Sequence, residues 1–454
     1  MRKLAVLIII LSLGSPVFAI NLEEALTRGY ENNDELKAIR NKFLDEVEQF
    51  PQAFSGFMPS ASLEVAKVNT KNKFNSQYAN TLGRTPKEVD SQQGALKIKQ
   101  SIFSGGSSVA ALKSAQSAFR AARGNYYTQE QKILLSLINA YLDYYETKEK
   151  YEISESRLRT NIQQIRTVEE KLRLGEATEI DMATARAGLA AAETDKLIAY
   201  ANFQSKKAAF IKSFGIEPDN ITMPALPENL PTSLDELTQK AIKLNPNIDA
   251  ARHSVHATKA NEMVEKGKLL PQVEFNVQSG KTYYNPEDIV QRDINNRTIT
   301  STLSVTIPIY PNGGAQYSNI RKAKNQTRSN AIQLDNTIKQ IQAIAISSWE
   351  EFAAAKSRII STNHGVEAAQ ISYNGTVQEE IVGSKTILDV LSAEDKLYEA
   401  KTSRVDAYKA SIIAAYQMKS LTGELTAKSL KLKVRYFSPE DEFKNIKKKL
   451  IIGF

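Results

Sequence analysis

Cysteine is absent from the 454 residues of the chain, and histidine occurs only 3 times. The lack of cysteine excludes a disulfide framework, a thiolate metal site and a lipidated N-terminal cysteine. His253 and His256 have a helical spacing that could ligate a metal ion, but no further local histidine completes a site. We therefore interpret both as surface histidines, and we expect neither a metal nor a cofactor.

Sequence motifs of enzyme chemistry are also missing. No phosphate-binding glycine loop, nucleophile–base pair or dinucleotide fingerprint occurs in the chain. The pairs Gly105-Gly106 and Gly313-Gly314 each stand between a strand pattern and a helical pattern, so we interpret them as turns. The chain is therefore not expected to be an enzyme.

Long apolar runs are scarce. Leu4–Leu13 is an apolar run of 10 residues, too short to cross a bilayer as a helix. Arg2 and Lys3 precede this run, and Val17-Phe18-Ala19 fits a cleavage site, so we predict a signal peptide over residues 1–19. A retained membrane anchor is the alternative. After Ile20 no apolar run is long enough for a membrane helix, so the exported chain is either soluble or held in a membrane by strands.

The net charge of +8 is concentrated at the two ends of the chain. The basic residues of the tail are Lys428, Lys431, Lys433, Arg435, Lys444, Lys447, Lys448 and Lys449. A run of this kind is typical of a solvated segment, so we favour that interpretation over a lipid or nucleic-acid site. The basic composition is therefore no indication of a nucleic-acid partner.

Proline is missing from two runs of nearly 70 residues, Gly106–Arg173 and Gly314–Val382. A helix of that length would extend about 100 Å, which is rare in globular domains. Apolar and small residues step by 3 and 4 along the second run, as in a coiled coil: Ala331, Leu334, Ile338, Ile341, Ala345, Ser348, Phe352, Ala355 and Ile359. We therefore predict two long rods that pack against other helices.

The sequence repeats internally. Gly105-Gly106, Gly175 and Gly215 recur 208 residues later, as Gly313-Gly314, Gly383 and Gly423. We predict the following organisation: signal peptide 1–19, first structural repeat 20–220, Pro-rich linker 221–232, second structural repeat 233–423, and basic C-terminal tail 424–454. Each repeat has the order helix, two strands, long helix, turn, long helix.

Each long helix is predicted to end at a glycine and to return as a second helix. Gly175 and Gly383 suit the left-handed residue that ends a helix. The pairs Thr178/Asp181 and Thr386/Asp389 have the spacing of a capping box. The chain therefore carries two helical hairpins.

The strand patterns alternate with period two, so one face of each strand is apolar. The alternatives are an antiparallel sheet on a soluble core, or strands that cross a membrane. Four strands cannot close a barrel, and open edges in lipid leave backbone groups unpaired, so membrane strands would have to close between chains. The polar face would then line the bore: Glu64, Lys97, Lys99, Thr302 and Ser304.

The duplicated layout resembles the TolC family of outer-membrane efflux ducts. The resemblance rests on strands that follow Pro59 and Pro271, on the Gly-Gly turns, and on the Gly-x-x-Thr-x-x-Asp tips, and it covers about residues 20–423. It implies an α+β fold in which a homotrimer forms a 12-strand outer-membrane β-barrel, with four strands from each chain. The barrel would continue into a long periplasmic α-helical coiled-coil barrel.

The resemblance also implies a function and partners. Such a duct is a passive conduit from the periplasm of a Gram-negative bacterium to the exterior, for drugs, metals or unfolded proteins. It sits in outer-membrane lipid and works with a periplasmic adaptor (membrane fusion) protein. Energy comes from an inner-membrane pump, of the ABC or resistance-nodulation-division type, in a tripartite efflux or type I secretion system. A secreted coiled-coil scaffold or adhesin without a pore is the alternative.

The resemblance further implies a pore gate where the hairpin tips meet. The matching residues here are Asp181, Lys385 and Asp389, although both aspartates could equally be capping residues. Ser392 and Glu380 depart from the family pattern, standing where a second acidic ring residue and an aromatic gate partner can occur.

The tips are also where adaptors dock in this family. The matching residues are Leu174 and Gly175 at the first tip, and Val382 and Gly383 at the second. An apolar residue often follows the glycine in the family, whereas Glu176 and Ser384 stand there in this chain.

Overall fold

A computed structural model describes residues 20–71, 88–218, 220–284 and 296–449. The predicted signal peptide lies outside these residues. In chain order the elements are α1 (Leu22–Asn32), α2 (Asp34–Val47), α3 (Gln49–Ser55), β1 (Ser60–Lys71), β2 (Glu88–Ser104), α5 (Ser107–Leu174), α6 (Glu179–Phe214), α7 (Leu234–Leu244), α8 (Pro246–Gly267), β3 (Gln272–Tyr284), β4 (Asn296–Thr306), the 3₁₀ turn η2 (Pro311–Gly314), α9 (Ala315–Ile381), α10 (Ile387–Leu421) and α11 (Pro439–Lys449). Within the described ranges, no helix has both the length and the apolar character required to span a bilayer.

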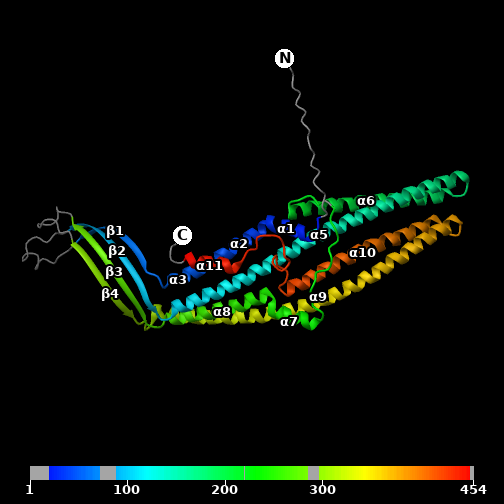
Figure 1. Cartoon of the computed structure of the whole chain (residues 1–454). Helices are drawn as coiled ribbons and strands as arrows, with labels where there is room; N and C mark the ends of the chain where they lie inside the picture. Colours follow the sequence, from blue (N-terminus) through cyan, green and yellow to red (C-terminus); the bar gives the residue numbers. More distant parts are fainter. Residues whose placement is uncertain (1–19, 72–87, 219, 285–295, 450–454) are drawn as a thin grey trace, which may run out of the picture. The chain divides into compact units, whose positions relative to one another are not determined.

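The chain divides into two compact units, whose helices and strands are labelled in Figure 1. The hairpin unit comprises Met1–Arg40, Tyr126–Ile248 and Ile338–Phe437. The sheet unit comprises Asn41–Asn125, Asp249–Thr337 and Ser438–Phe454. Each unit takes segments from both predicted repeats, and α5 and α9 each contribute residues to both units.

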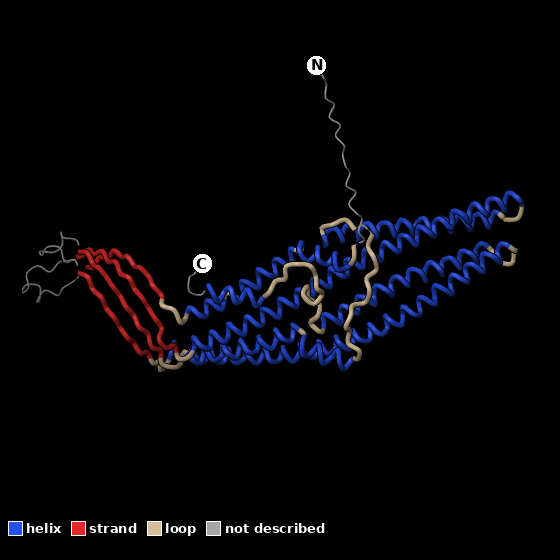
Figure 2. The backbone as a smooth tube through the Cα atoms, viewed as in Figure 1, coloured by secondary structure: helices blue, strands red, loops and turns tan. Residues whose placement is uncertain are grey.

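The sheet unit contains one antiparallel sheet with the strand order β1-β2-β3-β4, drawn in red in Figure 2. The central β2–β3 pair joins a strand of the first repeat to a strand of the second. A β-bulge between Ser101 and Phe103 shifts the register and places Phe103 opposite Val273. The alternation along β2 is therefore interrupted at Ile102, because the bulge inserts that residue between two paired positions.

The two faces of the sheet differ in polarity, as the alternation predicts. On one face Leu63 pairs with Leu96, and Phe275 pairs with Leu303. These side chains are exposed in the chain, Leu63 by 74% and Leu303 by 66%. An uncovered apolar face contradicts the alternative of a sheet on a soluble core, since a soluble core would bury it.

The opposite face of the sheet is polar and carries cross-strand ion pairs. Lys97 pairs with Glu64, and Lys99 lies 2.8 Å from a carboxylate oxygen of Glu274. The register sets Lys99 opposite Asn276 and Asn276 opposite Thr302, so these residues lie in one row across the sheet. The two-faced sheet thus matches a band with lipid on one side and water on the other.

The hairpin unit is built from α5 with α6 and from α9 with α10. α5 has 68 residues and α9 has 67, which confirms the two predicted rods of about 100 Å each. Ile341, Ala345, Ser348 and Ala355 of the predicted α9 stripe are buried. Small residues in this stripe let neighbouring helices approach closely.

The core of the hairpin unit lies where the Pro-rich linker crosses the helices. The hydroxyl of Tyr141 on α5 donates to the backbone carbonyl of Thr222 at 2.7 Å. Phe210 and Phe214 of α6 and Leu237 of α7 are fully buried. Large apolar side chains from both repeats therefore hold the bases of the hairpins in place.

Candidate functional site at the hairpin tips

The two hairpin tips have the same local construction. α5 ends at Leu174 and is followed by Gly175 with φ +78°, while α9 ends at Ile381 and is followed closely by Gly383 with φ +79°. Only glycine adopts this left-handed conformation without strain, so the glycine sets the turn at each tip. Thr178 and Thr386 then cap the returning helices α6 and α10.

Asp181 and Asp389 both complete a capping box. The backbone N–H of Thr178 donates to Oδ2 of Asp181 at 2.9 Å, and Thr386 donates to Asp389 at the same distance. The hydrogen bonds from Thr178 lower the pKa of Asp181, and those from Thr386 lower the pKa of Asp389. Both carboxylates are therefore ionised near neutral pH, and both have the structural role foreseen as an alternative to a gate.

Lys385 precedes the second cap. Its backbone N–H donates to the carbonyl of Glu379 at 3.3 Å, and its charge makes a minor contribution to the lowered pKa of Asp389. Over the described ranges no ion pair joins Lys385 to either aspartate. A single chain thus brings Lys385 near Asp389, but it does not bring Asp181 to them.

The four predicted docking residues lie at the two turns. Leu174 is 63% exposed and Val382 is 78% exposed. A Cβ at Gly175 or Gly383 would meet no atom within 4 Å, so the surface around both glycines is open. Each tip therefore presents exposed apolar side chains, among them Leu174 and Val382, and an uncovered turn to a neighbour.

An ion pair that was not predicted from the sequence joins the two hairpins. Nζ of Lys171 on α5 lies 2.7 Å from Oε1 of Glu380 on α9, and these side chains are only 22% and 15% exposed. We call this pair the tip latch. A signal for it exists in the repeat, because 171 plus the offset of 208 gives 379, one position before Glu380. Side chains from nearly equivalent positions of the two repeats therefore contact each other near the tips.

Farther from the tips, Arg157 of α5 binds both returning helices. Its guanidinium donates to Asp195 of α6 at 2.5 Å and also to Asp395 of α10. We call these three residues the Arg157 clamp. Beside it, Asn161 donates to Glu394 at 2.8 Å, and burial raises the pKa of Glu394.

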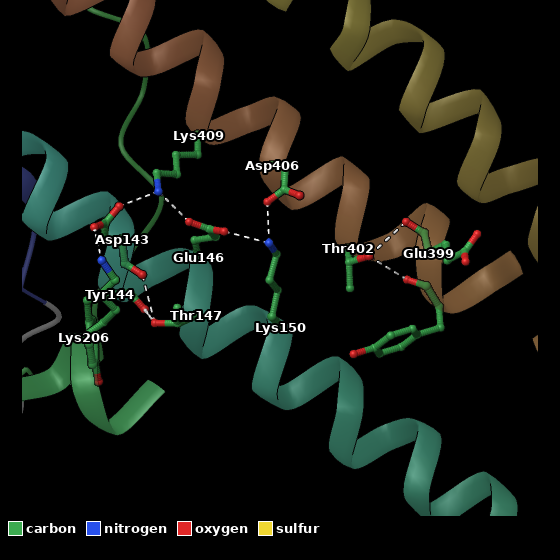
Figure 3. Close-up of polar contacts among 11 residues, drawn as sticks. Asp143, Tyr144, Glu146, Thr147, Lys150, Lys206, Glu399, Thr402, Asp406 and Lys409 are labelled. Carbon is green, nitrogen blue, oxygen red and sulfur yellow. Dashed lines mark hydrogen bonds and ion pairs between the residues drawn. The ribbon is translucent and has the colours of Figure 1, made fainter. Parts of the chain in front are cut away.

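Six charged side chains form a further link between α5, α6 and α10, shown in Figure 3. We call them the mid-hairpin network: Asp143, Glu146, Lys150, Lys206, Asp406 and Lys409. Lys409 pairs with Asp143 and, at 2.6 Å, with Glu146, while Lys150 bridges Glu146 and Asp406. The network joins the first hairpin to the second through alternating charges.

A cavity of about 530 Å³ lies between the latch and the clamp. The lining residues from α5 mostly bear an amide or a hydroxyl, as in Thr160, Gln163, Gln164 and Thr167, whereas those from α9 and α10 are mostly apolar, as in Val377, Ile381, Ile387 and Val390. Val168, Met182, Ala185 and Ile387 form the small apolar core beside it. Packing at this level is therefore looser than at the bases of the hairpins.

The two histidines of α8 are not grouped with enough acidic side chains to form a metal site among the described residues. His256 is exposed as predicted, but His253 is not, because its side chain is only 16% exposed and lies 3.4 Å from Asp249 on the preceding turn of α8, and burial lowers the pKa of His253. Within the part of the chain that the structure describes, no three histidine, aspartate or glutamate side chains are grouped as metal ligands would be. The tips therefore remain the candidate site.

Comparisons with known proteins match nearly the whole chain. The outer membrane efflux protein BepC of Brucella suis is 27% identical over 439 residues, covering 96% of this chain and 92% of that protein. The outer membrane protein TolC of Vibrio cholerae is 22% identical over 443 residues, covering 94% of this chain and 96% of that protein.

Solved structures show the same fold. The CmeC outer membrane channel of Campylobacter jejuni superposes with a TM-score of 0.76 at 15% identity, covering 95% of this chain and 89% of that one. This likeness confirms the α+β, TolC-like fold predicted from the sequence.

The family model named "Outer membrane efflux protein" matches residues 30–215 and 237–424. Relatives and family are channels, so they support the duct and not the pore-free scaffold or adhesin. The same match accounts for the missing enzyme motifs, because channels of this kind are passive conduits. The chain belongs to the outer membrane efflux protein family.

Proposed function

We propose that three copies of the chain close into the outer-membrane duct of a tripartite efflux or type I secretion system. The observation that carries this is the sheet, because it has an exposed apolar face, a polar face and two unpaired edges, β1 and β4. Open edges leave unpaired backbone groups in lipid, so a membrane sheet of this size has to continue into another copy. The duct would extend into the periplasm through the long helices.

The mass of the detergent-extracted protein tests the closure between chains. Light scattering with the detergent subtracted should give the mass of three protomers. A monomer with the same helix content would contradict the proposal, since four strands cannot form a closed membrane barrel. A variant with proline at the β4 edge, Thr302→Pro, should lower the trimer fraction, because proline removes a ladder donor.

The hairpin tips would form the gate of this duct. Asp181 and Asp389, repeated around a symmetric bore, would make rings of negative charge that attract cations, and Lys385 would hold the closed tip between neighbouring chains. The tip latch would hold the two hairpins of one chain together. Supporting this, Asp181 and Asp389 have lowered pKa values, and the ammonium group of Lys385 forms no ion pair within its own chain over the described ranges.

Single-channel conductance in planar bilayers tests the gate. Lys385→Ala and Glu380→Gln should each raise the conductance of the resting pore, because each removes one link at the tip. Lys339→Ala, on α9 and exposed, is the matched control and should leave conductance unchanged. Unchanged conductance in both tip variants would count against a gate at this position.

The exposed tips would also dock a periplasmic adaptor protein through Leu174, Gly175, Val382 and Gly383. The paired inner-membrane pump would supply the energy for transport. Cross-linking from cysteines introduced at Leu174 or Val382 should capture an adaptor in cells. Equal capture from a cysteine at the exposed Ile198 on α6 would show that contact at the tips is not selective.

A further inference from the structure

The C-terminal helix α11 is docked on the sheet unit and runs antiparallel to the start of α5. Oε1 of Glu440 lies 3.3 Å from the guanidinium of Arg123, and the ring of Phe443 stacks on that of Phe119 at 3.8 Å between centroids. A step of three residues forward on α11 thus corresponds to a step of four residues back on α5. The end of α11 therefore points toward the first residue of α5.

The last turn of α11 lies close to the level where helices give way to strands. Nζ of Lys447 is 5.2 Å from the ring centroid of Phe50, on the helix that immediately precedes β1. Phe119 is 12 residues from the start of α5 at Ser107, about 18 Å along the helix. Lys447 is one helical turn, about 6 Å, beyond Phe443. About 12 Å along the helix axis therefore remains between Lys447 and the start of α5.

The junction between helices and strands carries exposed apolar and aromatic side chains. Phe57 and Met58 stand just before β1, Leu270 just before β3, and Ile309 and Tyr310 just after β4, and all of them are exposed. Aromatic side chains gather where a membrane protein crosses the interface between lipid and water. This junction therefore marks the periplasmic edge of the lipid, with the end of α11 on its aqueous side.

The last three lysines of α11 form no ion pair within the part of the chain that the structure describes. Lys444 pairs with Asp441 at 3.1 Å, whereas no carboxylate pairs with Lys447, Lys448 or Lys449 among the described residues. All three are exposed, and Lys447 lies over the rings of Phe50 and Phe443. A helix dipole favours cations in a last turn, but it does not require three of them beside a lipid edge.

We propose that Lys447, Lys448 and Lys449 bind the headgroups of anionic phospholipids in the periplasmic leaflet of the outer membrane. The polar headgroup layer extends about 5–7 Å beyond the hydrocarbon on each side, so the ammonium groups at the end of α11 lie at the outer border of that layer, with lysine stems that can extend into it. The ring of Phe443 stacks on Phe119 and meets the ring of Phe50 edge-on, which fixes the helix that presents the three lysines. The tail that the sequence analysis interpreted as solvated thus becomes a lipid contact that rests on the outer-membrane location of the family.

Native mass spectrometry of the full-length, detergent-extracted protein tests this site. Phosphatidylglycerol and phosphatidylethanolamine with identical acyl chains are added in turn, and the ratio of bound lipids is measured. The wild type should prefer phosphatidylglycerol, and the variant Lys447→Gln/Lys448→Gln/Lys449→Gln should lose this preference by at least about fivefold. The control Lys428→Gln/Lys431→Gln/Lys433→Gln removes the same charge from the hairpin unit and should keep it.

Other outcomes would overturn the proposal. An equal loss in the control variant would assign the preference to overall charge, and no loss in the first variant would exclude these lysines. Full competition by soluble glycerol phosphate would indicate a site for a free anion rather than for a membrane. If the glutamine variant fails to assemble, the wild type still decides, because a preference that does not fall with added salt contradicts a charge-based site.

Discussion

The tips and the mid-hairpin network hold the same helices in different ways. At the tips Asp181 and Asp389 bind only within their own turns, and the latch between Lys171 and Glu380 crosses from one hairpin to the other. In the network, Lys409 of α10 binds Asp143 and Glu146 of α5, and Lys150 of α5 binds Asp406 of α10. The connection between the hairpins is therefore strong in the middle and weak at the end, so the end can change with few broken contacts.

The Arg157 clamp should give the largest effect on stability. Arg157→Ala would leave Asp195 and Asp395 without their shared cation, and Arg157 is only 10% exposed. We expect the unfolding free energy to fall by about 2 kcal/mol, discounted for the exposure of the two aspartates. Denaturant unfolding followed by circular dichroism measures it. Arg159→Ala, two residues away and exposed, is the control. An equal loss of unfolding free energy in that variant would contradict a specific role for the Arg157 clamp.

Lys409→Met should have the next largest effect. It removes one cation from two carboxylates, and we expect a loss of about 1 kcal/mol at neutral pH. Burial works to raise the pKa of Asp143, but hydrogen bonds from Lys206 and Lys409 outweigh it and lower the pKa. The pKa of Glu146 is lowered in the same way, by Lys150 and Lys409.

The pH dependence of this loss has a definite sign. Because folding lowers both pKa values, their contribution is complete above the ordinary values of 3.8 and 4.5, and is lost as pH falls through the folded values. Wild type and Lys409→Met should therefore converge in stability as the pH falls below about 4. Parallel curves over the acid range would show that the network is not electrostatic.

The capping threonines should give smaller and equal effects. Thr178→Ala and Thr386→Ala each remove a hydroxyl that binds the carboxylate and the first turn, at a local cost of about 1 kcal/mol. Hydrogen exchange in the first turns of α6 and α10 should rise about fivefold, with little change in the network. Thr184→Ala is the control, because its hydroxyl only donates to Ile180 within the helix. Unequal effects would mean that the two tips are not alike.

Glu394→Gln should have the smallest effect and the opposite sign. Burial raises the pKa of Glu394 above its ordinary 4.5, so the ionised form weakens the fold as pH rises through the raised pKa. The amide keeps the bond from Asn161 and should stabilise the chain by less than about 1 kcal/mol at neutral pH. The gain in unfolding free energy should vanish near pH 4. Glu399→Gln, at an exposed position, is the control and should show no gain. A gain that persists at low pH would contradict this account.

Local rules predicted much of the fold. The two rods, the glycine turns and the Thr–Asp caps each depend on residues a few positions apart, so periodicity and spacing are sufficient. The ion pairs between hairpins are different, since Arg157 and Asp395 are 238 positions apart. They depend on how the helices are aligned along their axes, which the packing of whole stripes determines. The bulge at Ser101 was hidden for the same reason, because it is visible only in pairing with β3.

The strand order has a consequence for mixed assemblies. β1 and β4 are the outer strands of one chain, so in a closed ring each chain must offer both edges to different neighbours. A chain that folds but has one damaged edge would still enter rings through its intact edge, and every ring that it enters would stay open. Co-expression of such a subunit should therefore inactivate a larger fraction of the channels than its own share of the subunits. This dominant-negative effect follows from the order of the four strands.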